Sequence, residues 1–500
     1  MTLRDLFFGI KYELIQGNMD NEIMGISVHS KKAKQKDLFF CIAGTKVNGA
    51  SFLSEVQRAD VSAIVTEQDL EAFSNTTVIK VQNIRKTMAK ISCMFYGNPS
   101  RKLTMIGITG TKGKTTTAFM LYHLLKTAGI TTGLIGTVGV FDSFGEHPTS
   151  NTTPESCDLQ KILADMVLQG ITTVVMEVSS QGVMMERVHG IEFDYGIFTN
   201  MSEDHIGKGE HKSFEEYKYF KKQLMKQSKC SIINVDDACS LEMIEASRRV
   251  VTYGCLERAD YQALDVSLLA KDSLLGVSFC LCDNRQNKKQ NIVVGMPGFY
   301  SMYNALAAIA ACESIGIGDE KVYKCLLQFC VRGRMEFVAV SDAFSLYIDY
   351  AHNQASLEQV LLSVKAYPHN RILLVFGCGG NRFKQKRSLM GKVACRLADM
   401  TILTNDNPRD ENPESIIQDI VYGFDGKANY LMIQERKEAI RYAITHAKQN
   451  DIVILAGKGH ETYQEICGIK YEMDERVLIR EIMEEENART ICGYNHRYFD

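Results

Sequence analysis

Glycine, lysine and threonine occur at the spacing of a phosphate-binding loop in the segment GITGTKGKTTT, residues 107–117. In such a loop, backbone N–H groups and the start of a helix bind phosphate oxygens, Lys114 supplies a cation, and the Thr115 hydroxyl ligates Mg²⁺. The strict consensus has glycine where this chain has Ile108, so the match is to a variant. The alternative is a glycine-rich turn that binds nothing. The residues expected to contact ATP are Gly110, Thr111, Lys112, Gly113, Lys114, Thr115 and Thr116.

This loop requires a strand before it and a helix after it. The apolar run LTMIGIT (103–109) predicts the strand, and a helical pattern extends from about residue 114 to residue 127. Further strand-like runs are ITTVVMEVS (171–179), YGIFTN (195–200) and CSIINVD (230–236), with helical patterns between them. Apolar runs that alternate with helices are typical of a parallel sheet covered on both faces.

A second alternation of strands and helices follows Gly333 and Arg334. Its strands are RILLVFG (371–377), MTILTND (400–406) and DIVILAG (451–457), and they end in the turns GCGGNR, NDNPRD and GKGHE. This pattern predicts a smaller, doubly wound, Rossmann-like domain. Ligands of such sheets bind at the carboxyl ends of the strands, so we expect the three turns to surround one pocket.

The length indicates about three domains, because 500 residues are too many for a single core. We expect domains at 1–98, 99–334 and 335–500, the first with strands near 37–44 and 61–67. Hydrophobic residues make up 45% of the chain and charged residues 23%, as in ordinary globular proteins.

Charge, cysteine usage and hydropathy argue against several classes of protein. A formal net charge of -3 and the lack of a basic stretch give no case for nucleic-acid binding. The 15 cysteines are scattered without a CxxC pair, which favours reduced thiols. We find neither a secretory signal nor an apolar run that approaches the ~20 residues needed to span a bilayer. We therefore expect a cytoplasmic enzyme that does not bind membranes.

The segment TGTKGKTTT (109–117) resembles the TGTNGKTTT loop of the Mur ligases, which build the peptidoglycan stem peptide, and of the related folylpolyglutamate synthetases. Lys112 stands where most members have asparagine. MEVSSQG (176–182) resembles the family's MEVSSHG, whose glutamate, here Glu177, helps to bind magnesium. The resemblance implies a three-domain α/β fold: a central P-loop ATPase domain between an N-terminal UDP-binding domain and a C-terminal Rossmann-like domain.

Two further motifs resemble the family's magnesium ligands. FTNMSEDH (198–205) is similar to FTNLxxDH, which implies that His205 contributes to a second magnesium site. The chain continues IGKGEH where the family has LDYHG. FEEYKYFKKQLM (214–225) resembles a helix that carries a carbamylated lysine, and the matching residue is Lys221. Without the resemblance, His205 would be interpreted as a structural residue and Lys221 as part of a solvated helix face.

The C-terminal motif TNDNPRDENP (404–413) resembles the DNPR motif of the members that add meso-diaminopimelate as the third stem-peptide residue. Arg409 can bind a carboxylate through two parallel hydrogen bonds, and diaminopimelate has a second carboxylate that lysine lacks. The alternative is a turn in which Arg409 faces water. The amino-acid-binding residues that this motif implies are Asp406, Asn407, Pro408 and Arg409.

Other C-terminal segments match the family in the same order. GCGGNRFKQKR (377–387) implies that Arg382 binds the amino acid, and AGKGHETYQ (456–464) implies that Gly457 and Glu461 do so, Glu461 by accepting the substrate's ammonium. IDYAHNQASLE (348–358) places Asp349 and His352 near the nucleotide, and GRMEFV (333–338) resembles the family's hinge.

The N-terminal part resembles the family less closely. ISVHSKKAKQKDLFFCIAG (26–44) keeps Ser30 of the uridine-nucleotide motif, but His29 and Lys31 replace the usual Asp and Arg, and Met185 stands where glutamine is common. The residues that the resemblance implies for binding the UDP-muramoyl peptide are Ser30, Asn151, Thr152, Thr153, Ser179 and Arg187.

The resemblance implies a monomeric, ATP- and Mg²⁺-dependent ligase that acts on small molecules. It would add meso-diaminopimelate to UDP-N-acetylmuramoyl-L-alanyl-D-glutamate through an acyl-phosphate. One alternative is a divergent Mur-type ligase of a specialised pathway, with a different carboxylate or amine. Another is a nucleotide-binding regulatory relative without turnover. The survival of Lys114, Thr115, Glu177, His205 and Lys221 argues against the last of these.

Overall fold

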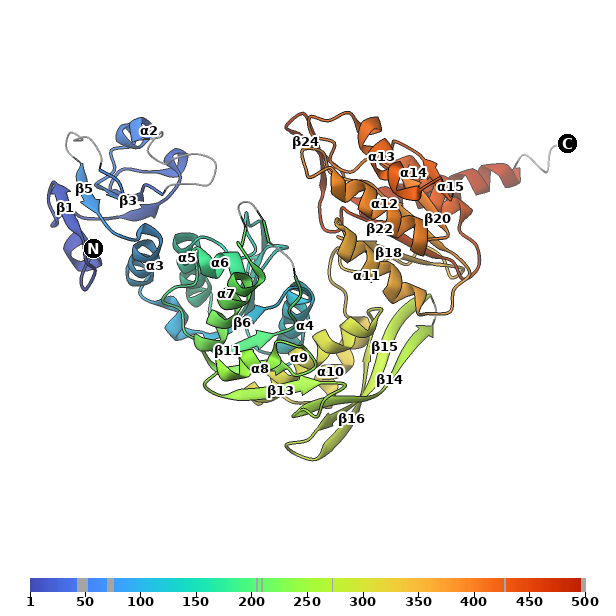
Figure 1. The fold of residues 1–500 in the computed structure, drawn as a ribbon, viewed down its shortest axis with the longest axis horizontal. Coiled ribbons are helices and arrows are strands. Elements are labelled where there is room, and N and C mark those ends of the chain that lie inside the picture. Colours follow the sequence, from blue (N-terminus) through green and yellow to red (C-terminus); the bar gives the residue numbers. More distant parts are fainter. Residues whose placement is uncertain are drawn as a thin grey trace. The chain divides into compact units, whose positions relative to one another are not determined.

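A computed structural model describes residues 1–42, 53–69, 76–203, 206–207, 210–271, 273–426 and 429–486, and the backbone of 487–495. The chain forms two compact units: Met1–Gln262 with Leu306–Val322, and Ala263–Ala305 with Tyr323–Asp500. Sheets of five, eleven and six strands organise them (Figure 1). Each of the three expected domain ranges contains one of these sheets. The boundaries after residues 98 and 334 stay predictions.

The N-terminal sheet has the order β1-β5-β4-β3-β2, with β1 antiparallel and the other strands parallel. Helix α3 begins after Asn83, whose side chain accepts a hydrogen bond from the Lys86 amide and so caps the first turn. The elements are α1 (Leu3–Leu6), β1 (Glu13–Gln16), β2 (Gly25–Ser27), β3 (Asp37–Phe40), α2 (Leu53–Arg58), β4 (Ala63–Thr66), β5 (Thr77–Lys80) and α3 (Ile84–Phe95).

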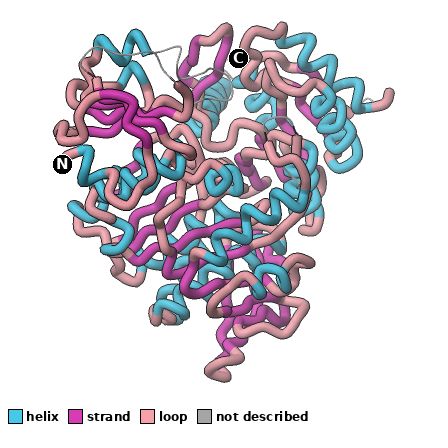
Figure 2. Tube along the Cα trace, turned by 60° about the vertical axis from the view of Figure 1, so that its left-hand side comes forward, coloured by secondary structure: helices cyan, strands magenta, loops and turns pink. Residues whose placement is uncertain are grey.

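The central sheet places β6, the strand before the phosphate loop, between β10 and β11. From β13 to β7 the strands are parallel, and most of their residues are buried, as the apolar runs predicted. Helices flank the strands (Figure 2). The elements are β6 (Thr104–Thr109), α4 (Lys114–Thr127), β7 (Thr132–Ile135), β8 (Val140–Asp142), β9 (Gly145–His147), α5 (Ser156–Leu168), β10 (Thr173–Glu177), α6 (Ser180–Met184), β11 (Phe193–Phe198), α7 (Phe214–Lys226), β12 (Ser228–Asn234), α8 (Ser240–Glu245) and β13 (Val250–Gly254).

A turn at residues 96–102 joins the first two sheets. Asn98 adopts a left-handed conformation with φ of 50°, and a short 3₁₀ helix follows at Pro99–Lys102. Nearby, Arg85 of α3 pairs with Glu155 at the start of α5, at 3.2 Å between Nη1 and Oε2. This ion pair links the two sheets' helices within the first unit.

The three strands that follow were not predicted from the sequence. β14 (Tyr261–Lys271) pairs with β13 in parallel, begins in the first unit and continues into the second, where β15 (Leu274–Asp283) and β16 (Lys288–Val294) form an antiparallel hairpin. Their buried and exposed residues alternate imperfectly, so the pattern of period two is weak. Helices α9 (Phe299–Ile315) and α10 (Glu320–Tyr323) come next.

The C-terminal sheet has the order β17-β18-β22-β19-β20-β21 and is parallel except for β17, which confirms the doubly wound prediction. Residues of α14 and α15 pack on one face of it. The elements are β17 (Glu336–Phe337), β18 (Ser345–Asp349), α11 (Gln354–Lys365), β19 (Ile372–Phe376), α12 (Gln385–Leu397), β20 (Met400–Leu403), α13 (Pro413–Val421), β21 (Tyr430–Met432), α14 (Arg436–His446), β22 (Ile452–Ala456), β23 (Tyr463–Ile466), β24 (Ile469–Glu472) and α15 (Glu475–Asn495).

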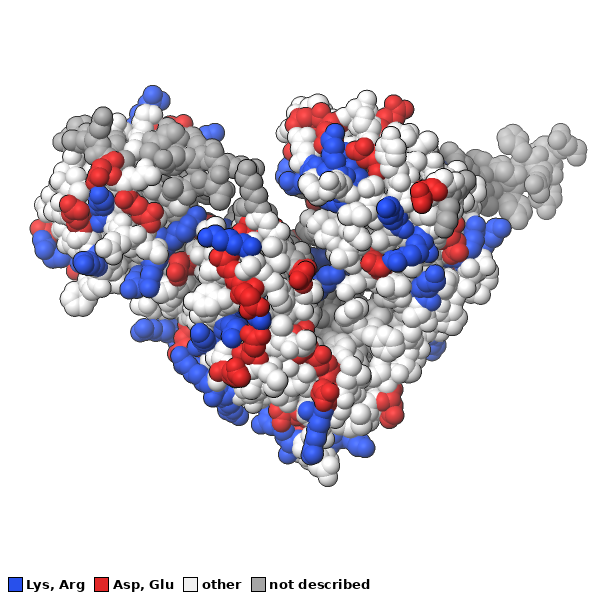
Figure 3. Space-filling model, in the orientation of Figure 1, with Lys and Arg blue, Asp and Glu red and all other residues white. Residues whose placement is uncertain are grey.

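The surface and the thiols are unremarkable within the described residues. Among the helices that the structure describes, none is long and apolar enough to cross a bilayer. The cysteines of this part of the chain are free thiols. Basic and acidic side chains are interspersed over the face shown in Figure 3.

Candidate active site

The phosphate loop joins the buried strand β6 to α4, as the sequence predicted. Gly110 and Gly113 have φ of 150° and 84°, and residues with a Cβ rarely adopt such backbone angles. A Cβ on Gly110 would lie 1.9 Å from the Thr199 hydroxyl oxygen, so the chain tolerates only glycine there. The tight turn leaves backbone amides of the loop at the start of α4, where a phosphate binds favourably.

Two residues after β11 hold this loop in place. The Asn200 side chain accepts a hydrogen bond from the Lys112 amide at 2.9 Å and donates one to the Lys112 carbonyl at 3.0 Å. The Thr199 hydroxyl donates to the same carbonyl at 2.7 Å. Sequence reasoning gave neither residue a role, although both lie in the FTN motif. The Thr111 hydroxyl is held by Tyr217, at 3.2 Å.

Two lysine ammonium groups meet at the phosphate loop. Lys114 Nζ donates to the carbonyls of Gly110 and Thr111 at 2.7 and 3.0 Å. Lys221 Nζ, from α7, donates to the Gly110 carbonyl at 2.7 Å and lies 4.5 Å from the centre of the Tyr217 ring. Lys221 is only 1% exposed, so the alternative that it belongs to a solvated helix face is wrong.

Thr115 and Glu177 form the oxygen-rich part of the site. The Thr115 hydroxyl lies 3.0 Å from Glu177 Oε2, and the carboxylate also accepts the Thr137 amide at 2.8 Å. A hydroxyl and a carboxylate are ligand types that Mg²⁺ uses when nucleotide phosphates complete its coordination. The described residues contain no group of three or more His, Cys, Asp or Glu placed to hold a metal by themselves. Thr137 was missed, because it lies in a segment without a recognisable motif.

His205 falls outside the described residues, so its expected magnesium role stays a prediction. The described residue nearest to it in the motif's altered loop is Ile206. In the same loop, the buried His211 lies 2.9 Å from the Ser180 hydroxyl through Nε2. The loop that departs from the family pattern is therefore anchored next to the MEVSSQG segment.

Three of the residues expected to bind the muramoyl peptide gather at the end of β10. The Thr153 hydroxyl donates to the Glu177 carbonyl at 2.9 Å and accepts the Ser179 amide at 3.0 Å. The Ser179 hydroxyl caps α6 by accepting the Gly182 amide. Arg187 Nη1 donates to the Thr153 carbonyl at 3.1 Å.

The other three residues expected to bind the muramoyl peptide have different surroundings. The Thr152 hydroxyl lies 3.0 Å from that of Thr137. Asn151 lies in a turn with Thr149, whose hydroxyl donates to the Asn151 carbonyl at 2.9 Å. Ser30, in the N-terminal domain, donates to Glu55 Oε2 at 2.7 Å. Thr152 therefore joins the cluster at β10, whereas Ser30 is bound within its own domain.

The three expected turns of the C-terminal sheet contact one another. A Cβ on Gly457 would lie 2.8 Å from Asp406 Oδ2, and one on Gly377 would lie 2.1 Å from the Thr404 carbonyl. A Cβ on Gly379 would lie 2.8 Å from Arg409 Nη1. The turns after β19, β20 and β22 thus meet at the carboxyl edge of the sheet.

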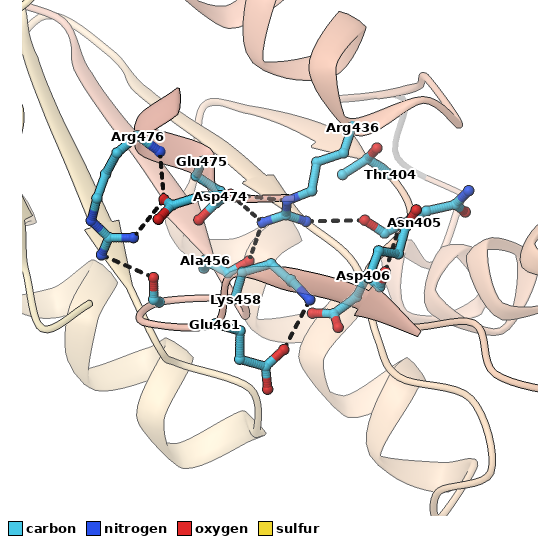
Figure 4. Close-up of polar contacts among 12 residues, drawn as sticks. Thr404, Asn405, Asp406, Arg436, Ala456, Lys458, Glu461, Asp474, Glu475 and Arg476 are labelled. Carbon is cyan, nitrogen blue, oxygen red and sulfur yellow. Dashed lines mark hydrogen bonds and ion pairs between the residues drawn. The ribbon is translucent and has the colours of Figure 1, made fainter. Parts of the chain in front are cut away.

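Glu461 already has a cationic partner within the protein. The fully buried Lys458 donates from Nζ to Glu461 Oε2 at 2.9 Å (Figure 4). The same ammonium donates to Asn407 Oδ1 at 2.9 Å. Asn407 Nδ2 donates to the same Glu461 oxygen at 2.9 Å. Burial opposes ionisation of Glu461, but the Lys458 ammonium outweighs it and lowers the pKa of the carboxyl. The sequence interpretation missed Lys458 although it lies inside the GKGHE motif.

Arg409 is also paired, which contradicts the alternative that it faces water. Its Nε donates to Glu465 Oε2 at 3.0 Å and its Nη1 to the Gly380 carbonyl at 2.9 Å. The residue has a φ of 52°, and its side chain is 19% exposed. Glu465 comes from the β23 strand and was not foreseen. Arg382 is exposed, and its Cγ approaches Gly379.

A cavity of about 540 Å³ opens beside Arg409. It lies between the NDNPRDENP segment and the turn of the β23–β24 hairpin. The lining residues are Pro408, Arg409, Asp410, Glu411, Asn412, Pro413, Glu414, Gln434, Ile466 and Cys467. Its charged lining residues are three carboxylates and the Arg409 guanidinium, so a cationic group of a ligand would be favoured beside the carboxylates.

Asp349, expected near the nucleotide, is the last residue of β18 in the second unit, and His352, expected there too, lies three residues further on. The buried Asp349 carboxylate accepts the amides of Met335 and Ala351, each at 2.8 Å. Burial raises the pKa of Asp349, while the cation of Arg334 opposes that rise. His352 is exposed, and its Nδ1 lies 2.9 Å from the Tyr350 carbonyl. In this structure, Asp349 organises the GRMEFV turn.

Family models match the central and C-terminal parts of the chain, and known proteins match nearly all of it. The Mur ligase middle domain matches residues 108–312, and the Mur ligase glutamate ligase domain matches residues 333–459. The UDP-N-acetylmuramoyl-L-alanyl-D-glutamate--2,6-diaminopimelate ligase of Caldanaerobacter subterraneus subsp. tengcongensis is 44% identical over 97% of this chain and 99% of its own. The ligase of the same name from Clostridium perfringens is 38% identical over 97% of this chain and 100% of its own.

Solved structures agree with these matches. A UDP-N-acetylmuramoyl-L-alanyl-D-glutamate--2,6-diaminopimelate ligase structure superposes with a TM-score of 0.67 at 28% identity, covering 97% of this chain and 99% of that one. MurF from Acinetobacter baumannii has the same fold, with a TM-score of 0.64 at 17% identity and coverage of 97% and 98%. With the ordered motifs and the phosphate loop of the central sheet, these matches show that the chain belongs to the Mur ligase family, whose members are ATP-dependent amide-forming ligases.

Proposed function

We propose that the protein joins meso-diaminopimelate to UDP-N-acetylmuramoyl-L-alanyl-D-glutamate, with conversion of ATP to ADP and phosphate. The observation that carries this proposal is the convergence of Lys114, Lys221, Thr115 and Glu177 on one phosphate loop. Relatives of that name, at 38–44% identity over almost the full chain, support the choice of substrates. The product is a peptidoglycan precursor, so the reaction serves cell-wall growth, cell shape and division.

The first step brings two anions together, so it requires cationic groups near the phosphates. A carboxylate oxygen of the donor attacks the γ-phosphorus of ATP, and ADP leaves. Lys114 and the loop amides bind the phosphates, and Thr115 and Glu177 would hold Mg²⁺, which supplies further positive charge when bound. The acyl-phosphate then reacts with the substrate amine: a C–N bond forms, phosphate leaves, and the amine loses a proton.

We further propose that Lys221 is carbamylated and that His205 completes a second magnesium site. The burial of Lys221 and its place at the Gly110 carbonyl support a role at the loop. Carbamylation would convert its amine into a carboxylate, an oxygen ligand for Mg²⁺. Incubation with ¹³C-bicarbonate should give a carbamate signal in NMR spectra that Lys221→Arg lacks. A wild-type protein without that signal would contradict the modification.

We assign amine binding to the C-terminal turns, with Arg409, Asn407, Glu461, Gly457, Asp406, Pro408 and Arg382 as the proposed contacts. Asp349 and His352 stay proposed nucleotide contacts. The UDP-muramoyl dipeptide would be bound by Ser30, Asn151, Thr152, Thr153, Ser179 and Arg187. We place the reaction in the cytoplasm, where ATP is plentiful, and propose a monomer that acts on small molecules only.

The second candidate is a divergent Mur-type ligase with another carboxylate or amine. It is favoured by His29 and Lys31 in the uridine-nucleotide motif, by Met185, and by the altered loop at 206–210. Both candidates share the chemistry at the phosphate loop and differ in the donor site.

A steady-state assay of ADP release separates these candidates. UDP-N-acetylmuramoyl-L-alanyl-D-glutamate is offered with meso-diaminopimelate, with L-lysine, or without an amine. We expect turnover with meso-diaminopimelate and at least a ten-fold lower kcat/KM with L-lysine, because lysine lacks the second carboxylate. If this donor gives no ADP with any amine, the proposed function is wrong.

A further inference from the structure

Arg436 and Glu475 form an ion pair with no exposed surface at the start of helices α14 and α15. Arg436 Nε and Nη2 donate to Glu475 Oε1 at 2.9 and 2.7 Å, and both side chains are 0% exposed. The other carboxylate oxygen has no hydrogen-bond partner among the residues that the structure describes. Pairing two buried charges regains little more than their desolvation costs. Stability alone therefore does not explain this pair.

The other N–H groups of the same guanidinium contact the turns after β20 and β22. These turns, to which amine binding is assigned above, are called the amine-donor turns below. Arg436 Nη1 donates to the Asn405 carbonyl at 3.1 Å, and Nη2 donates to the Ala456 carbonyl at 3.0 Å (Figure 4). Asn405 directly precedes Asp406, and Ala456 directly precedes Gly457. β20 and β22, the strands before these turns, are not neighbours, because β19 lies between them. One planar group thus fixes the spacing of two turns across the end of a third strand.

The next residue of α15 holds the same turn at a second point. Arg476 Nη2 donates to the Gly459 carbonyl at 3.1 Å, and its guanidinium also pairs with Glu336 and Asp474. The GKGHE turn is therefore bound at Ala456 through Arg436 and at Gly459 through Arg476. Lys458, which holds Asn407 and Glu461, lies between these two points.

We propose that Arg436, oriented by Glu475, is the positioning residue of the amine-donor site. It touches no substrate. It sets the distance between the turn that carries Asn407 and Arg409 and the turn that carries Glu461, and so determines whether one amino acid can contact both. This inference rests on the proposed function of these turns.

The packing of α15 against α14 does not depend on this pair. Further along the two helices, Lys437 pairs with Glu481 at 2.7 Å, and Arg441 pairs with Glu485 and Glu486 at 2.6 and 3.1 Å. Apolar residues of both helices share one core with the sheet. A residue needed only to join these helices would therefore be redundant, whereas the contacts to Asn405 and Ala456 are particular to Arg436.

The test is the conservative variant Arg436→Lys. A lysine keeps a cation beside Glu475, but its compact ammonium cannot span the Asn405 and Ala456 carbonyls as the guanidinium fork does. We expect KM for meso-diaminopimelate to rise about 10- to 100-fold, because a small misplacement of binding groups has effects of that size. KM for ATP and for the muramoyl dipeptide should change less than about two-fold.

Arg441→Lys is the matched control. It makes the same replacement on the same helix and affects ion pairs to α15, but within the described part of the chain Arg441 has no polar contact with the turns after β20 and β22. Its KM for the amine should equal that of the wild type. If Arg436→Lys and Arg441→Lys give the same KM for the amine, or if Arg436→Lys raises all three KM values equally, the positioning role is wrong.

A second variant covers the case in which Arg436→Lys does not fold. The double variant Arg436→Met/Glu475→Leu removes both charges, an exchange that buried ion pairs often tolerate, and it also removes the ties to both carbonyls. The same selective rise in KM is expected, and its absence overturns the inference. Failure of the proposed function is distinguishable, because the wild type itself would then release no ADP from these substrates.

Discussion

At the scale of single residues, the charged groups of the candidate site are already paired within the protein. Glu461 has Lys458, Arg409 has Glu465, and Glu177 accepts hydrogen bonds from Thr115 and Thr137. A substrate that binds here exchanges partners with these groups. The net free energy of binding is therefore smaller than the number of the substrate's contacts suggests.

The pairing of Arg409 makes a double-mutant cycle informative. Arg409→Ala removes a guanidinium and leaves the Glu465 carboxylate unpaired near the proposed position of the substrate's second carboxylate. We expect KM for meso-diaminopimelate to rise about 10- to 100-fold, equivalent to roughly 1.5–3 kcal/mol, in the ADP-release assay. Adding Glu465→Gln should recover part of this loss, because the repulsion disappears. An unchanged KM in Arg409→Ala would refute its assigned role.

His460, within the GKGHE turn, predicts a pH dependence of stability. Burial, assisted by the cation of Arg334, lowers the pKa of its ring to about 4. An unfolded chain has a histidine pKa of about 6.5. Between these values the unfolded chain binds a proton that the folded chain does not, so the free energy of unfolding falls as the pH falls, by at most about 2 kcal/mol at pH 5.

The variant His460→Gln isolates this effect. Its melting temperature should fall less than that of the wild type between pH 7.5 and pH 5, as measured by calorimetry. Carboxylates titrate in both proteins, so only the difference between the two curves reports His460. Parallel curves would show that the ring does not titrate as proposed.

At the scale of secondary-structure elements, the start of α7 matters because this helix carries Lys221 to the phosphate loop. Ser213 precedes the helix, and its hydroxyl accepts a hydrogen bond from the Glu216 amide at 3.2 Å. Such a cap contributes about 1 kcal/mol to the first turn. Fraying of that turn would loosen the frame on which Lys221 is held.

Ser213→Ala should therefore increase hydrogen exchange in a peptide that covers residues 213–226. A loss of about 1 kcal/mol corresponds to roughly five-fold faster exchange in the first turn, measured by mass spectrometry. Ser213→Asp keeps a capping oxygen and should exchange as the wild type does. Equal exchange in the alanine variant and the wild type would mean that tertiary contacts alone hold the turn.

The elements that were predicted correctly are those with a strong local pattern. The strand and helix around the phosphate loop and the parallel strands of the C-terminal domain follow from apolar runs and glycine turns. The strands β14 to β16 lack such a pattern. Thr137, Asn200, Lys458 and Glu465 were missed because their roles depend on hydrogen bonds to distant segments.

At the scale of the whole molecule, the residues proposed for the nucleotide phosphates and for the amine belong to different compact units. The phosphate loop lies in the unit that contains residues 1–262, and the amine-donor turns lie in the unit that contains residues 323–500. The phosphate loop belongs to the eleven-stranded sheet and the turns belong to the six-stranded sheet, and a separate hydrophobic core packs against each. Ligands of the two sites should therefore stabilise different parts of the chain.

Calorimetry tests this independence. ADP with Mg²⁺ should raise the melting temperature of one transition, and meso-diaminopimelate should raise that of another. At a hundred-fold excess over Kd, each ligand should stabilise its transition by about 2.7 kcal/mol. Removing Mg²⁺ with EDTA should weaken only the first effect, and Lys114→Ala should abolish it. One shared transition that both ligands shift would contradict independent units.

The close approach of Gly110 to Thr199 has a consequence for antibacterial design. Any side chain at position 110 would overlap the threonine hydroxyl, and the left-handed backbone there adds a further penalty. A drug whose binding depends on the main chain of this turn would thus meet a residue that cannot be exchanged without loss of the enzyme. Resistance by mutation at that codon should consequently be rare.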